Sequence, residues 1–425
     1  MAVSARALAP PLCVDLDGAL IRSDVLLESL LVLLKRNPLY LFLAVGWLLR
    51  GGKQRLQAEL AARVELNAAA LLYNKDLLAW LQSEHNAGRE LWLYSTANTR
   101  IAAKVAQHLE LFDRVVERDA AELAVLPVFP AAGANRFRAT LRALRPHQWA
   151  KNVLVLVPLF TAHRLGDWHA LVAGLAAVVA FCLCASSVYL LNDMLDLEAD
   201  RGHPRKSKRP FASGDLSLAT GLVLAPALLA VAALIAAFLP GKFQLFLASY
   251  YVLTFGYSVK LKRMLLVDAV ALAGLYTLRI MAGAGAVMVP LSFWLLLFSV
   301  FLFLSLAFVK RYAELDALRR QQRLAALGRG YRVEDLAVLQ SFGTAAGYLS
   351  VLVLALYINS PEIEPLYHRP KAIWMLCVLM LYWISRVWMT AHRGGMHDDP
   401  VVYALRDRVS LGIGLLAAIT VAVAI

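Results

Sequence analysis

Residues 192–210 read NDMLDLEADRGHPRKSKRP and directly follow a long apolar run. Asn192, Asp196 and Asp200 are spaced four residues apart, so a helix that continues out of the apolar run would stack them on one face. Asp193 lies beside that face. Oxygen ligands of this kind suit Mg²⁺, which binds through a few carboxylates and the phosphates of a substrate. The stretch therefore predicts a metal site at the end of a membrane helix.

Five cations follow the acidic residues at once: Arg201, Arg205, Lys206, Lys208 and Arg209. Acidic metal ligands beside a basic run indicate a site for a phosphorylated substrate. The alternative is a set of ordinary charges flanking a membrane span, which are mostly Lys and Arg on the cytoplasmic side. That alternative explains the cations, but it does not explain three aspartates, an asparagine and a glutamate in front of them.

The composition is that of a protein with many membrane spans. Of the 425 residues, 60% are hydrophobic and 17% are charged, and the mean hydropathy is +0.61. A soluble globular protein of this size does not need so many apolar residues. The net charge of +13 is explained by cytoplasmic loops that face anionic lipid headgroups. We therefore predict the lipid bilayer as a partner, and no nucleic acid.

The chain divides into two parts of unlike character. Residues 1–125 have the pattern of a small soluble α/β domain, residues 126–140 contain prolines and small residues and are predicted to be a linker, and residues 141–425 are mostly long apolar runs. At about 20 residues per spanning helix, the third region predicts nine helices with these cores: 148–163, 167–191, 216–238, 242–258, 264–287, 290–309, 336–358, 371–391 and 409–425.

Loop charges predict how these spans are oriented. Alternate loops are rich in Arg and Lys, at 192–215, 259–263, 310–335 and 392–408. Because positive loops stay on the cytoplasmic side, we predict an inner-membrane protein with its N-terminus in the cytoplasm and its C-terminus outside.

The N-terminal part carries two short motifs. Residues 13–20 read CVDLDGAL and residues 91–97 read LWLYSTA. Together they resemble phosphatases of the haloacid-dehalogenase (HAD) type. The resemblance implies that Asp15 attacks phosphorus, that Asp17 is the general acid and base, and that Thr96 holds a phosphate oxygen, all near Mg²⁺. The later acidic segment of that family is not found before the linker, so we expect a truncated domain with weak or no activity.

One apolar segment in this part is too short to span a membrane. Residues 39–49 read LYLFLAVGWLL. The sequence leaves two interpretations open, a helix that caps the N-terminal domain or an interfacial helix that lies on the membrane.

The pattern NDxxDxxxD followed by RGHPRKSKRP resembles the first aspartate-rich motif of the UbiA superfamily of intramembrane prenyltransferases. The resemblance covers residues 141–425 and implies an all-α membrane fold in which Mg²⁺ holds a polyprenyl diphosphate. The second aspartate-rich motif of that superfamily is replaced here by KRYAELD at residues 310–316. This basic version is similar to decaprenyl-phosphate phosphoribosyltransferases, as are residues 145–153, 257–263, 278–286 and 397–408. That subgroup transfers phosphoribose from phosphoribosyl pyrophosphate (PRPP) to a polyprenyl phosphate.

These resemblances imply roles for individual residues. Asn192, Asp193, Asp196 and Asp200 are the expected metal ligands, and the three aspartates together with Glu314 are the expected catalytic residues. The expected substrate-binding residues are Lys151, Asn152, Arg201, Arg205, Lys208, Arg209, Tyr257, Lys260, Arg279, Lys310 and Arg311. Two plainer interpretations remain: Lys151 as a snorkelling anchor, and Lys310 with Glu314 as a helical ion pair.

Three other functions are compatible with the sequence. The first is an ordinary prenyltransferase, which moves a polyprenyl group from its diphosphate to an aromatic acceptor. The second is a transporter or lipid-binding scaffold, although the charged motifs gather at one face, whereas a transporter site is expected near the midplane. The third makes the phosphatase-like domain the enzyme and the spans its anchor, which leaves residues 192–200 unexplained.

Overall fold

The computed structural model describes residues 11–95, 99–116, 135–322, 330–361, 363, 367–396 and 399–425. It contains two compact units. Residues 1–145 and 189–227 form the first unit, and residues 146–188 and 228–425 form the second. The aspartate-rich segment is thus grouped with the N-terminal part of the chain.

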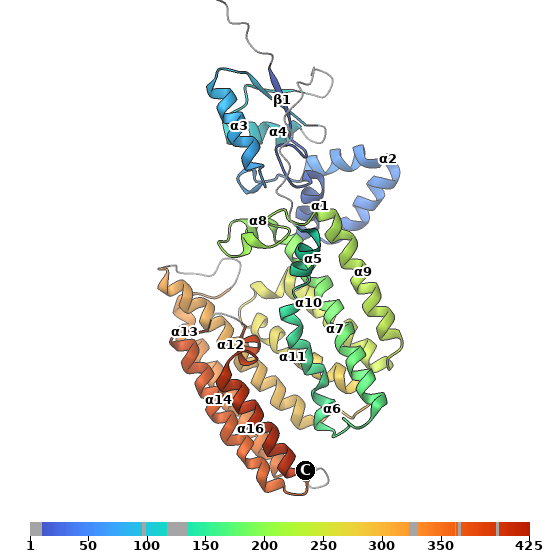
Figure 1. The fold of residues 1–425 in the computed structure, drawn as a ribbon, viewed down its shortest axis with the longest axis vertical. Coiled ribbons are helices and arrows are strands. Elements are labelled where there is room, and N and C mark those ends of the chain that lie inside the picture. Colours follow the sequence, from blue (N-terminus) through green and yellow to red (C-terminus); the bar gives the residue numbers. More distant parts are fainter. Residues whose placement is uncertain are drawn as a thin grey trace, which may run out of the picture. The chain divides into compact units, whose positions relative to one another are not determined.

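A small parallel sheet forms the centre of the first unit (Figure 1). The strands β1 (Leu12–Asp15), β2 (Leu91–Tyr94) and β3 (Arg114–Val116) are parallel and lie in the order β1-β2-β3. Leu12, Cys13 and Val14 of β1 and Leu91 and Leu93 of β2 are buried, as expected for parallel strands covered by helices. The predicted α/β character of this part is therefore confirmed.

Short helices complete the first unit: α1 (Val25–Arg36), α2 (Tyr40–Arg63), η1 (Ala68–Ala70), α3 (Lys75–Asn86), α4 (Thr99–Leu109), α5 (Arg136–Leu144), α8 (Leu197–Arg201) and η4 (Lys206–Lys208). Asp24 begins α1 because its side chain accepts a hydrogen bond from the Leu27 N–H. Of the predicted linker, residues 126–134 lie outside the described residues. Its remaining residues belong to α5, which Asn135 caps, so that end is helical.

Long helices build the second unit: α7 (Trp168–Leu195), α9 (Leu218–Ala237), α10 (Gly241–Val259), α11 (Val267–Ala286), α12 (Phe293–Arg320), α13 (Leu336–Ile358), α14 (Trp374–His392) and α16 (Arg408–Ala424). The last turns of α7 and the first half of α9 are grouped with the first unit. The shorter elements are η3 (Pro146–Leu156), α6 (Val157–Thr161), η5 (Leu261–Arg263), η6 (Val333–Asp335), η7 (Pro370–Ile373) and α15 (Pro400–Ala404).

Six helices in the described part of the chain are long and apolar enough to cross a membrane: those at 168–195, 218–237, 267–286, 293–320, 333–358 and 371–392. The nine predicted spans are not confirmed. The region of the first one folds as η3 and the five-residue α6, α10 is not among the six, and α16 has 17 residues.

A glycine explains why η3 lies so close to α11. A Cβ atom at Gly283 would lie 1.9 Å from the carbonyl oxygen of Val155. Only a residue without a side chain allows that backbone contact. The close approach brings Lys151 and Asn152, which lie on η3, to the buried face of α11.

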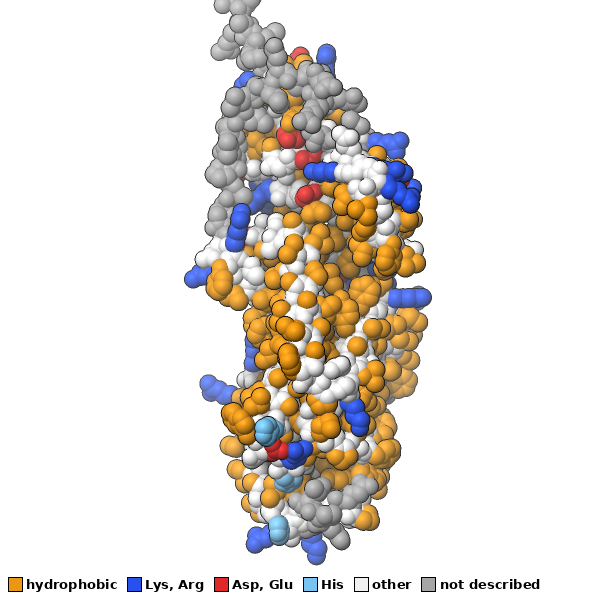
Figure 2. All heavy atoms as spheres, turned by 90° about the vertical axis from the view of Figure 1, so that its right-hand side faces the viewer, with side chains coloured by type: hydrophobic (Ala, Val, Ile, Leu, Met, Phe, Trp, Pro, Cys, Tyr) orange, Lys and Arg blue, Asp and Glu red, His pale blue; other side chains and the backbone are white. Residues whose placement is uncertain are grey.

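The outer surfaces of the long helices are apolar (Figure 2). Large side chains such as Phe238, Val223 and Val252 are 84%, 71% and 70% exposed. An extended exposed apolar surface is rare on soluble proteins and is what lipid tails would cover.

Candidate functional site

The aspartate-rich segment is nearly one continuous helix. α7 ends at Leu195, and α8 begins at Leu197 after a single irregular residue, Asp196. The Asp196 N–H still donates to the Asn192 carbonyl at 3.0 Å, and the Asp200 N–H to the Asp196 carbonyl at 2.8 Å. The helical spacing predicted for Asn192, Asp196 and Asp200 is therefore kept despite the break.

Two of the carboxylates share one arginine. Nη1 of Arg209 lies 2.9 Å from Oδ1 of Asp193 and 2.6 Å from Oδ2 of Asp200. Both aspartates are 2% exposed. Because both oxygens contact the same nitrogen, they are separated by no more than the sum of these distances, about 5.5 Å. Arg145 also pairs with Asp193.

Burial raises the pKa of the Asp200 carboxyl, and Arg209 opposes this shift. The guanidinium group therefore supplies the positive charge that two buried carboxylates require.

Helix α1 and the N-cap residue of η1 supply a second set of partners. Nζ of Lys35 lies 2.9 Å from Oδ1 of Asp196. Arg201 forms two hydrogen bonds with Glu28, which is 4% exposed. The amide of Asn67 donates to Glu198 at 3.0 Å. Nothing in the sequence pattern indicated these contacts, because they join residues more than 130 positions apart.

The acidic segment fits a divalent cation only after its present cations move. Among the described residues, no three His, Cys, Asp or Glu side chains form a group that could hold a metal ion. Asp193 and Asp200 nevertheless offer two close carboxylates, and Mg²⁺ usually takes one or two of these together with phosphate oxygens. Arg205 and Lys208 lie exposed in the basic run that follows.

The second unit contains a separate polar cluster, in which Asp399 joins two lysines. Oδ2 of Asp399 lies 2.8 Å from Nζ of Lys151 and 3.0 Å from Nζ of Lys310. The Tyr276 hydroxyl donates to Oδ1 at 2.9 Å, and the Val401 N–H donates to the same oxygen. Lys151 is 8% exposed, so it is a buried ion-pair partner and not a snorkelling anchor.

The charges of this cluster affect one another. Burial alone would raise the pKa of the Asp399 carboxyl, but Lys310 and Lys151 together hold it well below its usual range. Burial lowers the pKa of the Lys151 ammonium to about 8, although Asp399 opposes this shift. Asp399 was missed as a site residue because its contacts come from η3, α11 and α12.

Arg279 occupies a buried aromatic pocket. Its Nε donates to the Asn152 side chain and its Nη2 to the Tyr250 hydroxyl, both at 2.9 Å. The guanidinium lies 4.7 Å from the Tyr250 ring centre and 5.4 Å from that of Tyr276. Asn152 thus orients the Arg279 guanidinium. A cation with a fixed orientation is suited to binding an anion.

Arg311 is enclosed by acidic and phenolic groups. It is 1% exposed, and its Nε lies 2.7 Å from Oδ2 of Asp268, which is fully buried. Arg311 also pairs with Glu314 and donates to the Tyr257 hydroxyl at 3.1 Å. The Tyr331 hydroxyl donates to Asp268. The predicted Lys310 and Arg311 thus belong to two neighbouring charge networks, while Lys260 lies exposed at the end of α10.

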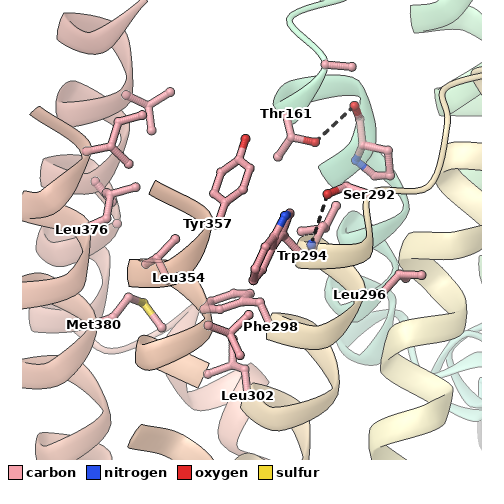
Figure 3. Close-up of a pocket in the computed structure, with 18 of the residues that line it drawn as sticks. Thr161, Ser292, Trp294, Leu296, Phe298, Leu302, Leu354, Tyr357, Leu376 and Met380 are labelled. Atoms are coloured by element: carbon pink, nitrogen blue, oxygen red, sulfur yellow. Dashed lines mark hydrogen bonds between the residues drawn. The ribbon is translucent and has the colours of Figure 1, made fainter. Parts of the chain in front are cut away.

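An apolar cavity of about 1360 Å³ lies in the second unit (Figure 3). Trp294, Phe298 and Leu302 of α12 face Leu354 and Tyr357 of α13 across it. Leu376 and Met380 of α14 complete this part of the wall. Lys310 follows Leu302 by eight residues on α12, about 12 Å at the usual helical rise.

The N-terminal aspartates lie at the carboxyl end of β1. The Asp17 N–H donates to Oδ1 of Asp15 at 3.0 Å, and the Ser95 hydroxyl donates to Asp17 at 3.2 Å. Burial raises the pKa of the Asp17 carboxyl, and the Ser95 hydrogen bond opposes this shift. Thr96, the residue predicted to hold phosphate, lies outside the described residues.

Comparisons with known proteins identify the membrane part. Residues 153–406 match the model of the UbiA prenyltransferase family. A protein named uncharacterized protein y4nM from Sinorhizobium fredii is 32% identical over 96% of this chain and 90% of its own length. The nodulation protein NoeC of Azorhizobium caulinodans is 38% identical over 65% of the chain and 89% of its own length.

Two further proteins are similar to this chain in sequence or in fold. The decaprenyl-phosphate phosphoribosyltransferase of Mycolicibacterium smegmatis is 33% identical over 66% of the chain and 91% of its own length. The structure of a UbiA homologue from Archaeoglobus fulgidus bound to DMAPP and Mg²⁺ is 17% identical, with a TM-score of 0.50, over 67% of this chain and 97% of its own. At that identity, the structural likeness shows the fold alone.

Proposed function

Because this chain belongs to the UbiA prenyltransferase family and is an integral membrane protein, we propose that it transfers 5-phosphoribose from PRPP to a polyprenyl phosphate at the cytoplasmic face, with Mg²⁺ as cofactor. Relatives named decaprenyl-phosphate phosphoribosyltransferase support this reaction. The assignment of donor and acceptor depends on the charges of the second unit.

The observation that carries the proposal is the basic cluster around Lys310. Among the described residues, its two networks contain the cations Lys151, Lys310 and Arg311 and the carboxylates Asp268, Glu314 and Asp399, and Arg279 lies next to them through Asn152. A second metal site would need an excess of carboxylates. A cluster whose described cations are not outnumbered by carboxylates suits a phosphate group of the substrate instead.

The aspartate-rich segment has a different role in this reaction. Asp193 and Asp200 would bind the metal once Arg209 has moved to a phosphate oxygen, and Asp196 would do so after separating from Lys35. Bound Mg²⁺ would neutralise the pyrophosphate of the donor. Arg205 and Lys208 are exposed and would balance the charge that grows on the leaving pyrophosphate.

The chemical step breaks the bond between C1 of the ribose and the pyrophosphate oxygen. A phosphate oxygen of the acceptor lipid forms the new bond at C1, and the pyrophosphate leaves with the bonding electrons. Lys310 and Lys151 would hold a phosphate group through ion pairs, while Arg279 offers a further cation beside Tyr250. Glu314, which is partly exposed, would orient a hydroxyl group or a water molecule.

The apolar cavity would hold the isoprenoid chain of the acceptor. Its wall is formed mainly by aromatic and aliphatic side chains of α12, α13, α14 and α16. Such a mostly apolar wall offers few polar partners for a sugar but covers a hydrocarbon well. The cavity also suits the second candidate, transfer of a prenyl group from its diphosphate to an aromatic acceptor.

A donor assay separates the two candidates. The full chain, purified in detergent with Mg²⁺ and polyprenyl phosphate, should convert labelled PRPP into a labelled lipid. Asp196→Ala and Lys310→Ala should each abolish the product, whereas Asp215→Asn, which removes a partly exposed carboxylate paired with Arg142, should retain it. No lipid from PRPP, together with transfer from a prenyl diphosphate to an aromatic acid, would establish the second candidate.

A further inference from the structure

The first half of α2 presents an apolar surface that no other element covers in the described part of the first unit. Seven large side chains between residues 39 and 49 are each about half exposed or more: Leu39, Leu41, Phe42, Leu43, Val45, Leu48 and Leu49. Phe42 is 75% and Leu49 80% exposed. Contiguous apolar surface of this kind marks an interaction site.

Only one narrow face of this half-helix packs on its own domain. Tyr40, Ala44 and Trp47, spaced four and three residues apart, contact the apolar core of the first unit. The remaining apolar side chains point elsewhere. A helix that is apolar all round is expected inside a protein or in contact with lipid. The core of the first unit covers only one side of this half-helix.

The charges beside the apolar half are all basic. Gly52, with φ of 62°, breaks α2 and separates its apolar first half from its polar second half. Arg50, Lys53 and Arg55 are exposed around this break. No acidic residue occurs between Glu28 and Glu59. An apolar surface edged only by cations complements the anionic headgroups of a bilayer.

Contacts within the first unit join α1, the helix that precedes α2, to the end of a span candidate. Lys35 of α1 pairs with Asp196, the residue that follows the last residue of the span candidate α7. The ion pair of Glu28 with Arg201 fixes α1 at the same point. Phe42 follows Lys35 by seven residues, so its Cα lies within about 25 Å of the Lys35 Cα even for extended chain.

We propose that residues 39–50 form an interfacial helix, which inserts its apolar side chains into the cytoplasmic leaflet and places Arg50, Lys53 and Arg55 among anionic headgroups. The eleven residues from Tyr40 to Arg50 give a helix of about 16 Å, which is too short to cross about 30 Å of hydrocarbon. The helix therefore lies along the membrane surface. This inference does not depend on the reaction that the protein catalyses.

Nitroxide labels on the full-length protein test the proposal. All four native cysteines are buried, so the wild-type protein serves as the blank for labelling. Phe42→Cys and Leu49→Cys carry the label on the apolar surface, and Gln82→Cys, at an exposed position of α3, is the matched control. Each variant is reconstituted at one copy per nanodisc in phosphatidylcholine with phosphatidylglycerol.

Collision rates with two relaxing agents give the result. At positions 42 and 49, we expect frequent collisions with oxygen, which is enriched in lipid, and few with a water-soluble nickel chelate. The ratio should be several-fold higher than at position 82. Frequent nickel collisions at 42 and 49 would show that the helix faces water and would overturn the proposal. A helix that only a second copy of the chain covers would give the same result, because each nanodisc holds one copy. Low rates with both agents would show that protein covers it and would also overturn the proposal.

Discussion

Replacing Arg311 by alanine should destabilise the protein as well as inactivate it. The Arg311 and Asp268 side chains are 1% and 0% exposed, and Nε lies 2.7 Å from the carboxylate. Without Arg311, the fully buried Asp268 would lose the cation beside it and would retain the hydrogen bond from the Tyr331 hydroxyl. Removing one member of a buried ion pair costs about 3–5 kcal/mol.

Lys310→Ala is the matched comparison. The Lys310 side chain is 29% exposed, and its partner Asp399 retains Lys151 and Tyr276 after the substitution. We therefore expect Lys310→Ala to lose transfer from PRPP while its thermal stability stays close to that of the wild type. Arg311→Ala should unfold at a temperature lower by roughly 6–10 °C, at about 2 °C for each kcal/mol in a domain of this size.

A double variant tests the physical reason. Arg311→Met combined with Asp268→Asn removes both buried charges and leaves an acceptor for the Tyr331 hydroxyl. It should recover much of the lost stability, because neutral replacement of a buried pair costs far less than breaking it. Thermal unfolding in detergent, followed by tryptophan fluorescence, measures all three variants. If Arg311→Ala is as stable as the wild type, or if the double variant is no more stable than Arg311→Ala, the assigned role is wrong.

Three further predictions concern single side chains. Transfer activity should fall as the pH rises through about 8, because Lys151 then loses its proton, and Lys151→Arg should keep activity to higher pH; identical pH profiles would contradict this. Lys35→Met should lower the Mg²⁺ concentration for half-maximal activity by up to about fivefold, since a partly exposed ion pair with Asp196 is worth about 1 kcal/mol or less; an increased requirement would show that Lys35 positions the carboxylate. Any hydrolysis of a phosphate monoester by the full chain should be the same in the wild type and in Asp15→Asn.

The sequence predicted local features well because they depend on spacing. The four-residue spacing of Asn192, Asp196 and Asp200 survives in the backbone hydrogen bonds of the segment. The short apolar runs at the start of the two N-terminal motifs form β1 and β2. The predicted first span, residues 148–163, does not form one long helix. An apolar run shows the length of a segment but not how closely a neighbouring helix approaches it, and here Gly283 allows the η3 backbone to contact α11.

The partners of the charged residues could not be predicted. A sequence pattern shows that Lys310, Arg311 and Glu314 share a helix, but Asp399, which contacts Lys310, comes from a loop 89 residues away. Lys35 and Glu28 contact the aspartate-rich segment from still farther along the chain. Such pairs form only when the tertiary fold brings separate elements together, and a single sequence carries no signal for that.

The ion pairs of the aspartate-rich segment limit how a metal could enter it. Asp193 and Asp200 share Arg209, and Asp196 contacts Lys35. A metal ion arriving alone would leave these cations without their carboxylates in a partly buried place, which is costly. A metal ion that arrives with a pyrophosphate would avoid that cost. Arg209 could then form its ion pair with a phosphate oxygen while Asp193 and Asp200 bind the metal. Mg²⁺ and the donor should therefore bind cooperatively, and the affinity for Mg²⁺, measured by calorimetry, should rise when pyrophosphate is present. Equal affinities with and without pyrophosphate would show that the carboxylates are available to the metal without this exchange.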